Sequence, residues 1–194
     1  YYQNIPLQER QIETAIININ ETEYNYKEDF YTYPSFGEIK INSSEIVFLG
    51  YGIDTKNYSD YTINTEGRVL LILSGEPKNK TGNYIVSGGK DRSPESSDRF
   101  KLSKAKEKGA KAVLFISENY QSDYKKAEHK IEHPGVSLMK KQEPIPFFHI
   151  SKKMAHDILD SKKIEKLKKK IKSKNKSHNK LIKKNIVLTT KNKD

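Results

Sequence analysis

The 194-residue sequence contains no cysteine, so neither a disulfide framework nor a thiolate metal site is available to it. No apolar run reaches the ~20 residues that a membrane-crossing helix needs, and the first residues do not resemble a signal peptide. The chain starts at Tyr1 without a methionine, and we expect it to be a fragment of a longer protein. Hydrophobic residues make up only 34% of it, which predicts stretches outside the core.

Arginine and aromatic residues are absent from the part of the chain that carries the excess positive charge. Residues 1–150 hold 20 basic and 21 acidic side chains, whereas 151–194 hold 16 and 4, so the net charge of +11 comes from the C-terminal part. Every basic residue there is lysine, and neither bidentate arginine contacts to phosphate nor base-stacking rings are available. This disfavours nucleic-acid binding and favours a solvated lysine face.

Two short, continuously apolar segments are predicted to be buried strands. They are Arg68–Leu73 (RVLLIL) and Ala112–Ile116 (AVLFI), and strands covered on both faces lack the alternation of half-exposed ones. A helix is expected between them, so the strand, helix, strand order predicts parallel pairing through a right-handed crossover.

The helix between these strands is predicted from a narrow apolar stripe. Leu102 and Ala105 lie on one side, while lysines including Lys101 are expected on the solvated side. Gly109 occupies the place where a helix ends in the left-handed conformation. We therefore expect the helix to stop just before Gly109.

Further strands are expected on both sides of this unit. Segments 11–20 and 24–33 predict a hairpin, and 45–53 and 145–150 predict two more strands. Segment 185–190 predicts a final strand that returns to pair with the first hairpin. Ser151 is expected to cap a helix that runs to about Leu159, and Ser161 to cap a second one with a stripe at Ile164, Leu167 and Ile171.

Two glycines at the end of segment 45–53 raise the question of a phosphate-binding loop. Gly50 and Gly52 enclose Tyr51, but a dinucleotide fingerprint also needs a third glycine and a following helix. A bulge or a close backbone approach is the favoured interpretation.

Two polar segments, 74–98 and 118–143, are predicted to be long loops. The first is rich in glycine, proline and serine, and its basic residues Arg92 and Arg99 could contact a carboxylate or a partner surface. Solvated side chains are the alternative for both arginines.

The sharpest local motif is the HxxEH segment formed by His129, Glu132 and His133. Inverzincin metallopeptidases use this spacing on a helix, where both imidazoles bind zinc and the glutamate acts on the bound water. A helix is essential to that chemistry, because only it places both rings on one face.

The context of the motif argues against a zinc site. Pro134 and Gly135 follow it directly and disfavour a helix, and the segment is expected in a polar loop. A third ligand would have to come from Glu143 or Glu165, and the positions of these residues in the sequence do not support either as a ligand. We interpret the motif as a chance occurrence and predict no metal ligand in this chain.

One more histidine, His149, is placed between Phe148 and Ile150 in a predicted strand. A hydrogen-bonded, half-buried imidazole is commoner there than a catalytic one. The sequence contains no GxSxG, no Walker loop and no carboxylate pair on a rigid element, so we predict no catalytic residue.

Three segments together resemble the protease-associated (PA) domain: 66–72, 105–116 and 145–150. The resemblance extends to residues 1–7, 28–30, 45–53, 60–61 and the strand before Lys191. Over nearly the whole chain the sequence is similar to the PA-bearing part of secreted bacterial aminopeptidases in metallopeptidase family twenty-eight.

The resemblance implies an α+β fold, a PA-domain-like β-sandwich or open barrel with a βαβ core and flanking helices. It divides the chain into N-terminal strands and a hairpin (1–44), the PA core (45–160), and a lysine-rich helix with a return strand (161–194) leading to a peptidase part.

The function implied is that of a non-catalytic domain that borders the cleft of a zinc aminopeptidase and influences substrate access or protein contacts. Its partners would be that peptidase domain and a peptide or protein substrate, the zinc would lie in the peptidase part, and the protein would be secreted, periplasmic or at the cell surface. The expected contacts are in the loop 76–99, namely Arg92, Arg99, Gly88, Gly89 and Asp91. The competing hypothesis is a free-standing basic module whose segment 162–184 binds polyanions or an anionic membrane.

Overall fold

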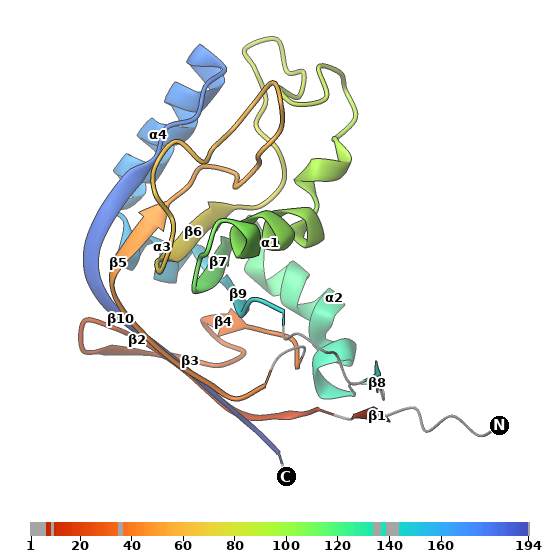
Figure 1. Cartoon of the computed structure of the whole chain (residues 1–194), viewed down its shortest axis with the longest axis vertical. Coiled ribbons are helices and arrows are strands. Elements are labelled where there is room, and N and C mark those ends of the chain that lie inside the picture. The colour runs from red at the N-terminus through yellow and green to blue at the C-terminus, as the bar shows by residue number, and fades with distance from the viewer. Residues whose placement is uncertain (1–6, 9, 35–36, 134–136, 139–143, 194) are drawn as a thin grey trace, which may run out of the picture.

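The computed structural model describes residues 7–8, 10–34, 37–133, 137–138 and 144–193 (Figure 1). The expected entry segment 1–7 therefore lies outside the described residues except for Leu7. The strands are β1 (Leu7–Gln8), β2 (Ile12–Ile19), β3 (Thr22–Asn25), β4 (Phe30–Tyr31), β5 (Ile39–Phe48), β6 (Val69–Leu73), β7 (Ala112–Ile116), β8 (Ser137–Leu138), β9 (Phe147–Ile150) and β10 (Lys180–Asn192). The helices are α1 (Asp98–Glu107), α2 (Tyr120–Glu132), α3 (Lys152–Ile158) and α4 (Ser161–Lys174), with a 3₁₀ turn at Pro94–Ser96.

One mixed sheet organises the molecule, with strand order β3-β2-β10-β5-β6-β7-β9-β4. Its two edge strands, β3 and β4, are neighbours in sequence and are linked by a bridge between Tyr26 and Phe30. The sheet therefore curls back on itself and forms a nearly closed, barrel-like surface. The extended run expected at 24–33 is thus two strands at opposite edges of the sheet, which is a correction, because periodicity does not report pairing partners.

The antiparallel half of the sheet is centred on β10. This strand of 13 residues pairs with β2 on one side and with β5 on the other. The prediction that the final strand returns to the first hairpin is confirmed, and Lys193 N donates to Gln11 O at 2.7 Å. The expected boundary between residues 44 and 45 lies within β5.

The parallel half contains the two apolar segments singled out in the sequence. β6 and β7 pair in parallel, with Val69 opposite Ala112 and Leu73 opposite Ile116, and α1 lies in the connection between them. β5 joins β6 and β9 joins β7, also in parallel. The predicted pairing of these two strands is confirmed.

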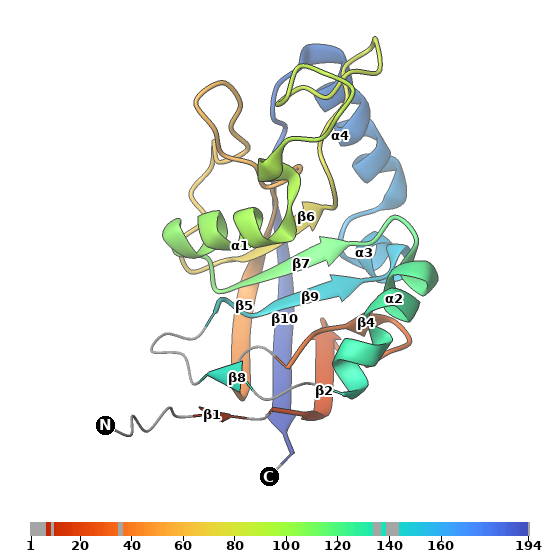
Figure 2. The same cartoon turned by 90° about the vertical axis from the view of Figure 1, so that its right-hand side faces the viewer.

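Helices cover both faces of the parallel strands. One face packs on α3 and the start of α4, through Met154, Ala155, Ile158 and Ile164 among others. The other face packs on α1 through Ala105, and α2 packs beside it through Ala127 in a cluster with Tyr31 of β4. Figure 2 shows α1 and α2 on the near side of these strands and α3 on the far side. None of the helices among the described residues is both long enough and apolar enough to cross a membrane.

The prediction of a long loop at 118–143 is largely wrong, because half of this segment is helix α2. Asn119 caps this helix by accepting from Ser122 N at 3.3 Å, and Tyr120, Ala127 and Ile131 are buried. These positions follow helical spacing, but tyrosine and alanine are weak hydrophobic signals in a lysine-rich segment. The helix ends at Glu132 with His133 as its C-cap, and Pro134 and Gly135 lie outside the described residues.

The other helices agree with the predictions except in two details. Ser151 caps α3 as expected, accepting from Met154 N at 3.2 Å, whereas Asp160, not Ser161, caps α4. Gly109 has a φ of 72° just after α1, as predicted. Lys101, expected on the solvated side of α1, is fully buried and donates to the carbonyl oxygens of Leu73 (3.1 Å) and Gly75 (2.7 Å).

The GYG segment is a close backbone approach, as the sequence favoured. A Cβ atom on Gly50 would lie 2.7 Å from Asp60 Oδ1, and one on Gly52 would lie 2.6 Å from Ile72 Cδ1. The Asp60 carboxylate is fully buried and accepts from the backbone N–H groups of Tyr51 (3.0 Å) and Ile53 (3.1 Å). Gly50 therefore allows close packing against a buried carboxylate, and Gly52 close packing against Ile72.

Candidate functional site

A cavity of about 960 Å³ opens between α1 and α2 on the face of the sheet that both helices cover. We call it the interhelix cavity. Its floor consists of aromatic side chains. Tyr31 comes from β4, Tyr33 lies two residues further along the chain, and Phe147 and His149 come from β9. Each helix packs on its own hydrophobic cluster, and the cavity lies between the two helices.

His149 is the polar group at the centre of the floor. Its imidazole stacks on the ring of Tyr31, with centroids 4.7 Å apart, and on that of Phe115, at 5.3 Å. Its side chain is 10% exposed, and its Nε2 lies 3.8 Å from Asp98 Oδ2. No residue that the structure describes forms a hydrogen bond with either imidazole nitrogen. The hydrogen-bonded histidine expected from the sequence is therefore not what the described residues form.

Burial lowers the pKa of His149 below its usual value, and the charges of Asp98 and Asp123 oppose this effect. The imidazole is consequently neutral near pH 7 and offers one donor and one acceptor nitrogen. Burial also raises the pKa of the neighbouring Tyr31 and Tyr33, so both hydroxyl groups stay protonated.

Basic side chains dominate the rim of the interhelix cavity. Five basic and two acidic residues are among those that line it, the acidic ones being Asp98 and Asp123. The basic residues are Arg92, Arg99, Lys106, Lys126 and Lys130. Arg99, Lys126 and Lys130 form no ion pair with any carboxylate of the described residues. The cavity therefore carries an excess of positive charge that the described part of the chain does not neutralise.

The loop before α1 reaches the cavity through Arg92, and a buried carboxylate holds this loop in place. Glu76 is 5% exposed, and its Oε1 accepts from Val86 N (2.9 Å) and Ser87 N (3.0 Å). Its Oε2 accepts from Ser93 N at 2.7 Å. The loop is thus folded onto one side chain, although its composition predicts little order.

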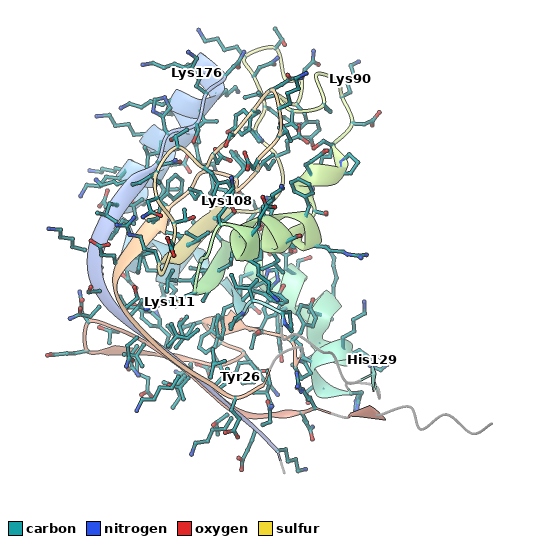
Figure 3. The ribbon with its side chains drawn as sticks, viewed as in Figure 1. Tyr26, Lys90, Lys108, Lys111, His129 and Lys176 are labelled. Atoms are coloured by element: carbon teal, nitrogen blue, oxygen red, sulfur yellow. The ribbon has the colours of Figure 1, made fainter. Side chains whose placement is uncertain are left out.

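The loop residues expected to make contacts fall into two groups in the structure, those that line the interhelix cavity and those that do not. Arg92 and Arg99 both line the interhelix cavity. Gly88, Gly89 and Asp91 are not among its lining residues: Gly88 N donates to Tyr84 O, Tyr84 N donates to Gly89 O, and Asp91 O accepts from Ser87 Oγ. Lys90 marks the tip that these residues form (Figure 3). These three residues shape the turn beside the site.

Sequence reasoning missed the floor of the cavity. Tyr31 and His149 are opposite each other in the pairing of β4 with β9, although 118 positions separate them in the chain. One signal was present, because Phe147 and His149 alternate with the buried Phe148 and Ile150 and so share the other face of the strand. What covers that face depends on α2, which the sequence did not reveal.

The HxxEH segment lies away from the cavity floor, at the C-terminal end of α2. The rings of His129 and His133 are 5.2 Å apart in an edge-to-face arrangement, and His129 is at the periphery of the molecule (Figure 3). Glu132 is paired with Lys27 at 2.5 Å, and Glu165 with Lys168 at 3.4 Å; Glu143 lies outside the described residues. Among the described residues no group of three or more potential ligands is placed to hold a metal ion.

Comparison with known proteins gives matches in structure. No family model matches the sequence, and no curated protein is similar to it. An aminopeptidase from Aneurinibacillus sp. strain AM-1 has a TM-score of 0.52 and 12% identity over 97% of this chain and 34% of its own. A Peptidase M28 precursor from Shewanella amazonensis SB2B has a TM-score of 0.43 and 12% identity over 99% of this chain and 37% of its own.

This chain thus spans about a third of the length of the solved structures that it matches. At 12% identity the first match establishes the fold and leaves the activity open. It agrees with the expected resemblance to the aminopeptidases. The chain has the fold of one part of an aminopeptidase.

Proposed function

We propose that this chain is the non-catalytic PA domain of a zinc-dependent aminopeptidase. The supporting observation is the structural match, which takes in 97% of this chain and only 34% of an aminopeptidase. The described residues offer no site that fits the zinc of such an enzyme. Metal and catalytic groups are therefore assigned to the remainder of the parent protein, and this chain to an accessory role.

The accessory role proposed is control of substrate access at the peptidase cleft. The loop 76–99 is the part assigned to the cleft, with Arg92 and Arg99 as contacts and Gly88, Gly89 and Asp91 shaping its turn. Support comes from the buried Glu76, which gives the loop a defined shape, and from the two arginines that line one cavity. The partners are the peptidase domain and a peptide substrate, in a secreted, periplasmic or surface-bound protein.

The test uses the complete gene product and this chain side by side. The complete product is expected to hydrolyse aminoacyl p-nitroanilides and to lose this activity on treatment with a zinc chelator, whereas this chain alone has none. Turnover by this chain alone, or a complete product without peptidase activity, would contradict the proposal.

The cleft assignment has its own test in the complete product. Residues 78–90 are replaced by a short glycine-serine linker, which removes the turn but leaves Glu76 and Arg92. The ratio of kcat/KM for long peptides to kcat/KM for aminoacyl reporters is expected to change, because only long substrates reach the loop. An unchanged ratio would rule out a role of residues 78–90 in substrate access, and Arg92→Ala with Arg99→Ala in the same assay tests the two proposed contacts.

A second candidate function is supported by the surface of α4. A shallow hollow along this helix is lined by Lys162, Lys166, Lys169 and Lys170 with Glu165 as its one acidic residue. Such a face could bind a polyanion or an anionic membrane, and the affinity would then fall steeply with salt. Heparin retention of this chain across ionic strength separates the two functions, since a PA domain requires no such retention.

A further inference from the structure

We propose that the interhelix cavity binds an acidic peptide segment, with an apolar side chain on its aromatic floor and carboxylates at its basic rim. This inference rests on the proposed function for its biological setting. It deepens that function by naming the chemical class of the substrate or partner. The binding site itself is argued from the geometry of this chain.

The size of the cavity is the first argument. About 960 Å³ is far more than an ion or a few water molecules fill, and it lies within the range of cavities that hold organic ligands. The space exists because α1 and α2 pack on separate clusters of the same sheet face. Helices form two of its walls and strands β4 and β9 contribute to its floor, while loop residues such as Arg92 and Ile145 complete its lining. The lining residues on the helices and strands are thus held on rigid elements.

The floor argues for a side chain and against a nucleobase. Tyr31 and Phe115 each stack on His149, so these ring faces are already occupied. Phe147 stands at 82° to the imidazole, and Tyr33 at 87°. Base stacking requires an open aromatic face, whereas an apolar side chain packs well against ring edges.

The rim argues for carboxylates. Arg99 on α1 faces the same cavity as Lys126 and Lys130 on α2, and none of the three is paired with a carboxylate of the described residues. Asp98 and Asp123 line the cavity as well, and their charge opposes a multiply charged phosphate more than a single carboxylate. They can also accept from backbone N–H groups, which a peptide supplies and an inorganic anion does not.

His149 provides an independent observation that points to a ligand. A polar side chain that is 90% buried normally has a hydrogen-bond partner, and the described residues supply none to this imidazole. Its nearest charged atom, Asp98 Oδ2, is 3.8 Å away, beyond hydrogen-bonding distance. A peptide carbonyl or amide at the cavity floor would supply the missing partner.

The experiment measures binding of fluorescein-labelled Glu-Asp-Phe-Glu-Asp to this chain by fluorescence polarisation. A peptide with alanine in place of phenylalanine tests the floor, and one with lysine in place of every acidic residue tests the rim. Arg99→Glu reverses one charge at the cavity, and Lys40→Glu makes the same change of net charge at an exposed position of β5 that does not line the cavity, as a matched control. Leu102→Trp fills the cavity from α1.

We expect Arg99→Glu and Leu102→Trp each to weaken binding by about tenfold or more, and Lys40→Glu to change it by less than about twofold. The alanine peptide should bind about tenfold more weakly, and the lysine peptide not at all. Amide and imidazole NMR signals of His149 should shift on addition of the acidic peptide.

Three results would overturn the proposal: no binding at about 1 mM peptide, equal losses in Arg99→Glu and Lys40→Glu, or displacement of the peptide from the cavity by AMP at lower concentration. These outcomes are independent of peptidase activity. If this chain binds the peptide but the complete product hydrolyses nothing, only the proposed function is contradicted. If the complete product is an active peptidase but this chain does not bind the peptide, only this inference is contradicted.

Discussion

Asp60 shows how a single buried carboxylate shapes the surrounding chain. Besides accepting from two backbone N–H groups, it accepts from the Tyr58 hydroxyl at 2.8 Å. Burial raises the pKa of Asp60 to about 6, against these hydrogen bonds, which lower it. The folded protein thus binds a proton at this site more tightly than the unfolded chain, whose aspartate pKa is about 3.9.

The sign of this shift predicts a specific pH dependence of stability. The stabilisation linked to protonated Asp60 is present below about pH 4 and is lost as the pH rises to about 6, a change of about 3 kcal/mol. Urea unfolding between pH 4 and 7 should therefore show a smaller loss of stability for Asp60→Asn than for the native chain. Asp91→Asn, at an exposed turn, is the control, and equal pH slopes in all three proteins would contradict the prediction.

Gly50 next to Asp60 allows a sharper test of packing. Its φ is 61°, and an added Cβ would lie 2.7 Å from Asp60 Oδ1, whereas Gly67 has a φ of 70° and no atom within 4 Å of its Cβ position. Gly67→Ala should lower the free energy of unfolding by only about 1 kcal/mol, the cost of placing an alanine in the left-handed conformation. Gly50→Ala should cost about 1–3 kcal/mol more, because the clash adds to it. Equal free energies of unfolding for the two variants would show that the carboxylate moves freely.

At the scale of elements, α2 is the part that changes the interpretation of the chain. It forms one wall of the interhelix cavity, and it carries the first part of the HxxEH motif. The helix ends at Glu132, and His133 is its C-cap with a φ of −126° and a ψ of 66°, so the second histidine is not helical. Glu132 is also engaged by Lys27, and no third ligand is placed near the two imidazoles among the described residues.

We accordingly expect no tight zinc site on α2. Isothermal titration of the metal-free chain with zinc should give only weak binding, because two exposed imidazoles without a third protein ligand form an incomplete site. His129→Ala should leave the titration unchanged within about twofold. Stoichiometric, tight zinc binding that is lost in His129→Ala would contradict this expectation and establish a metal site at His129.

At the scale of the whole molecule, β10 joins the two halves of the sheet. It is the last strand in sequence, yet it lies between β2 and β5, so the fold is complete only when the end of the chain is in place. Pairings this distant in sequence are closed late and cost loop entropy. The stability of β2 and β3 should consequently depend on β10.

This dependence is tested by substitutions on the two faces of β10. Leu188 is fully buried in the main core, while Val187 is half-buried on the other face. Leu188→Ala should cost about 2–5 kcal/mol and lower hydrogen-exchange protection in β2 and β5 together. Val187→Ala should cost less than about 1.5 kcal/mol. Loss of protection confined to one neighbouring strand would show that the two halves unfold independently.

The sequence alone determined those features that depend on neighbours in the chain. The buried strands β6 and β7, the end of α1 at Gly109 and the cap of α3 at Ser151 all follow from local composition and spacing, and the resemblance to aminopeptidases extended this to the fold. Arg92 and Arg99 were identified for the same local reason, as isolated arginines at a loop rich in glycine.

Only the tertiary structure decided what lies around those residues. Lys101 is buried because its ammonium group donates hydrogen bonds to two carbonyl oxygens at and just after the end of β6, and His149 lines a cavity because α1 and α2 pack on separate clusters with β9 between them. Both outcomes depend on pairings and helix positions across long stretches of chain. Hydrophobic periodicity specifies which face of an element is buried, but not which element covers it.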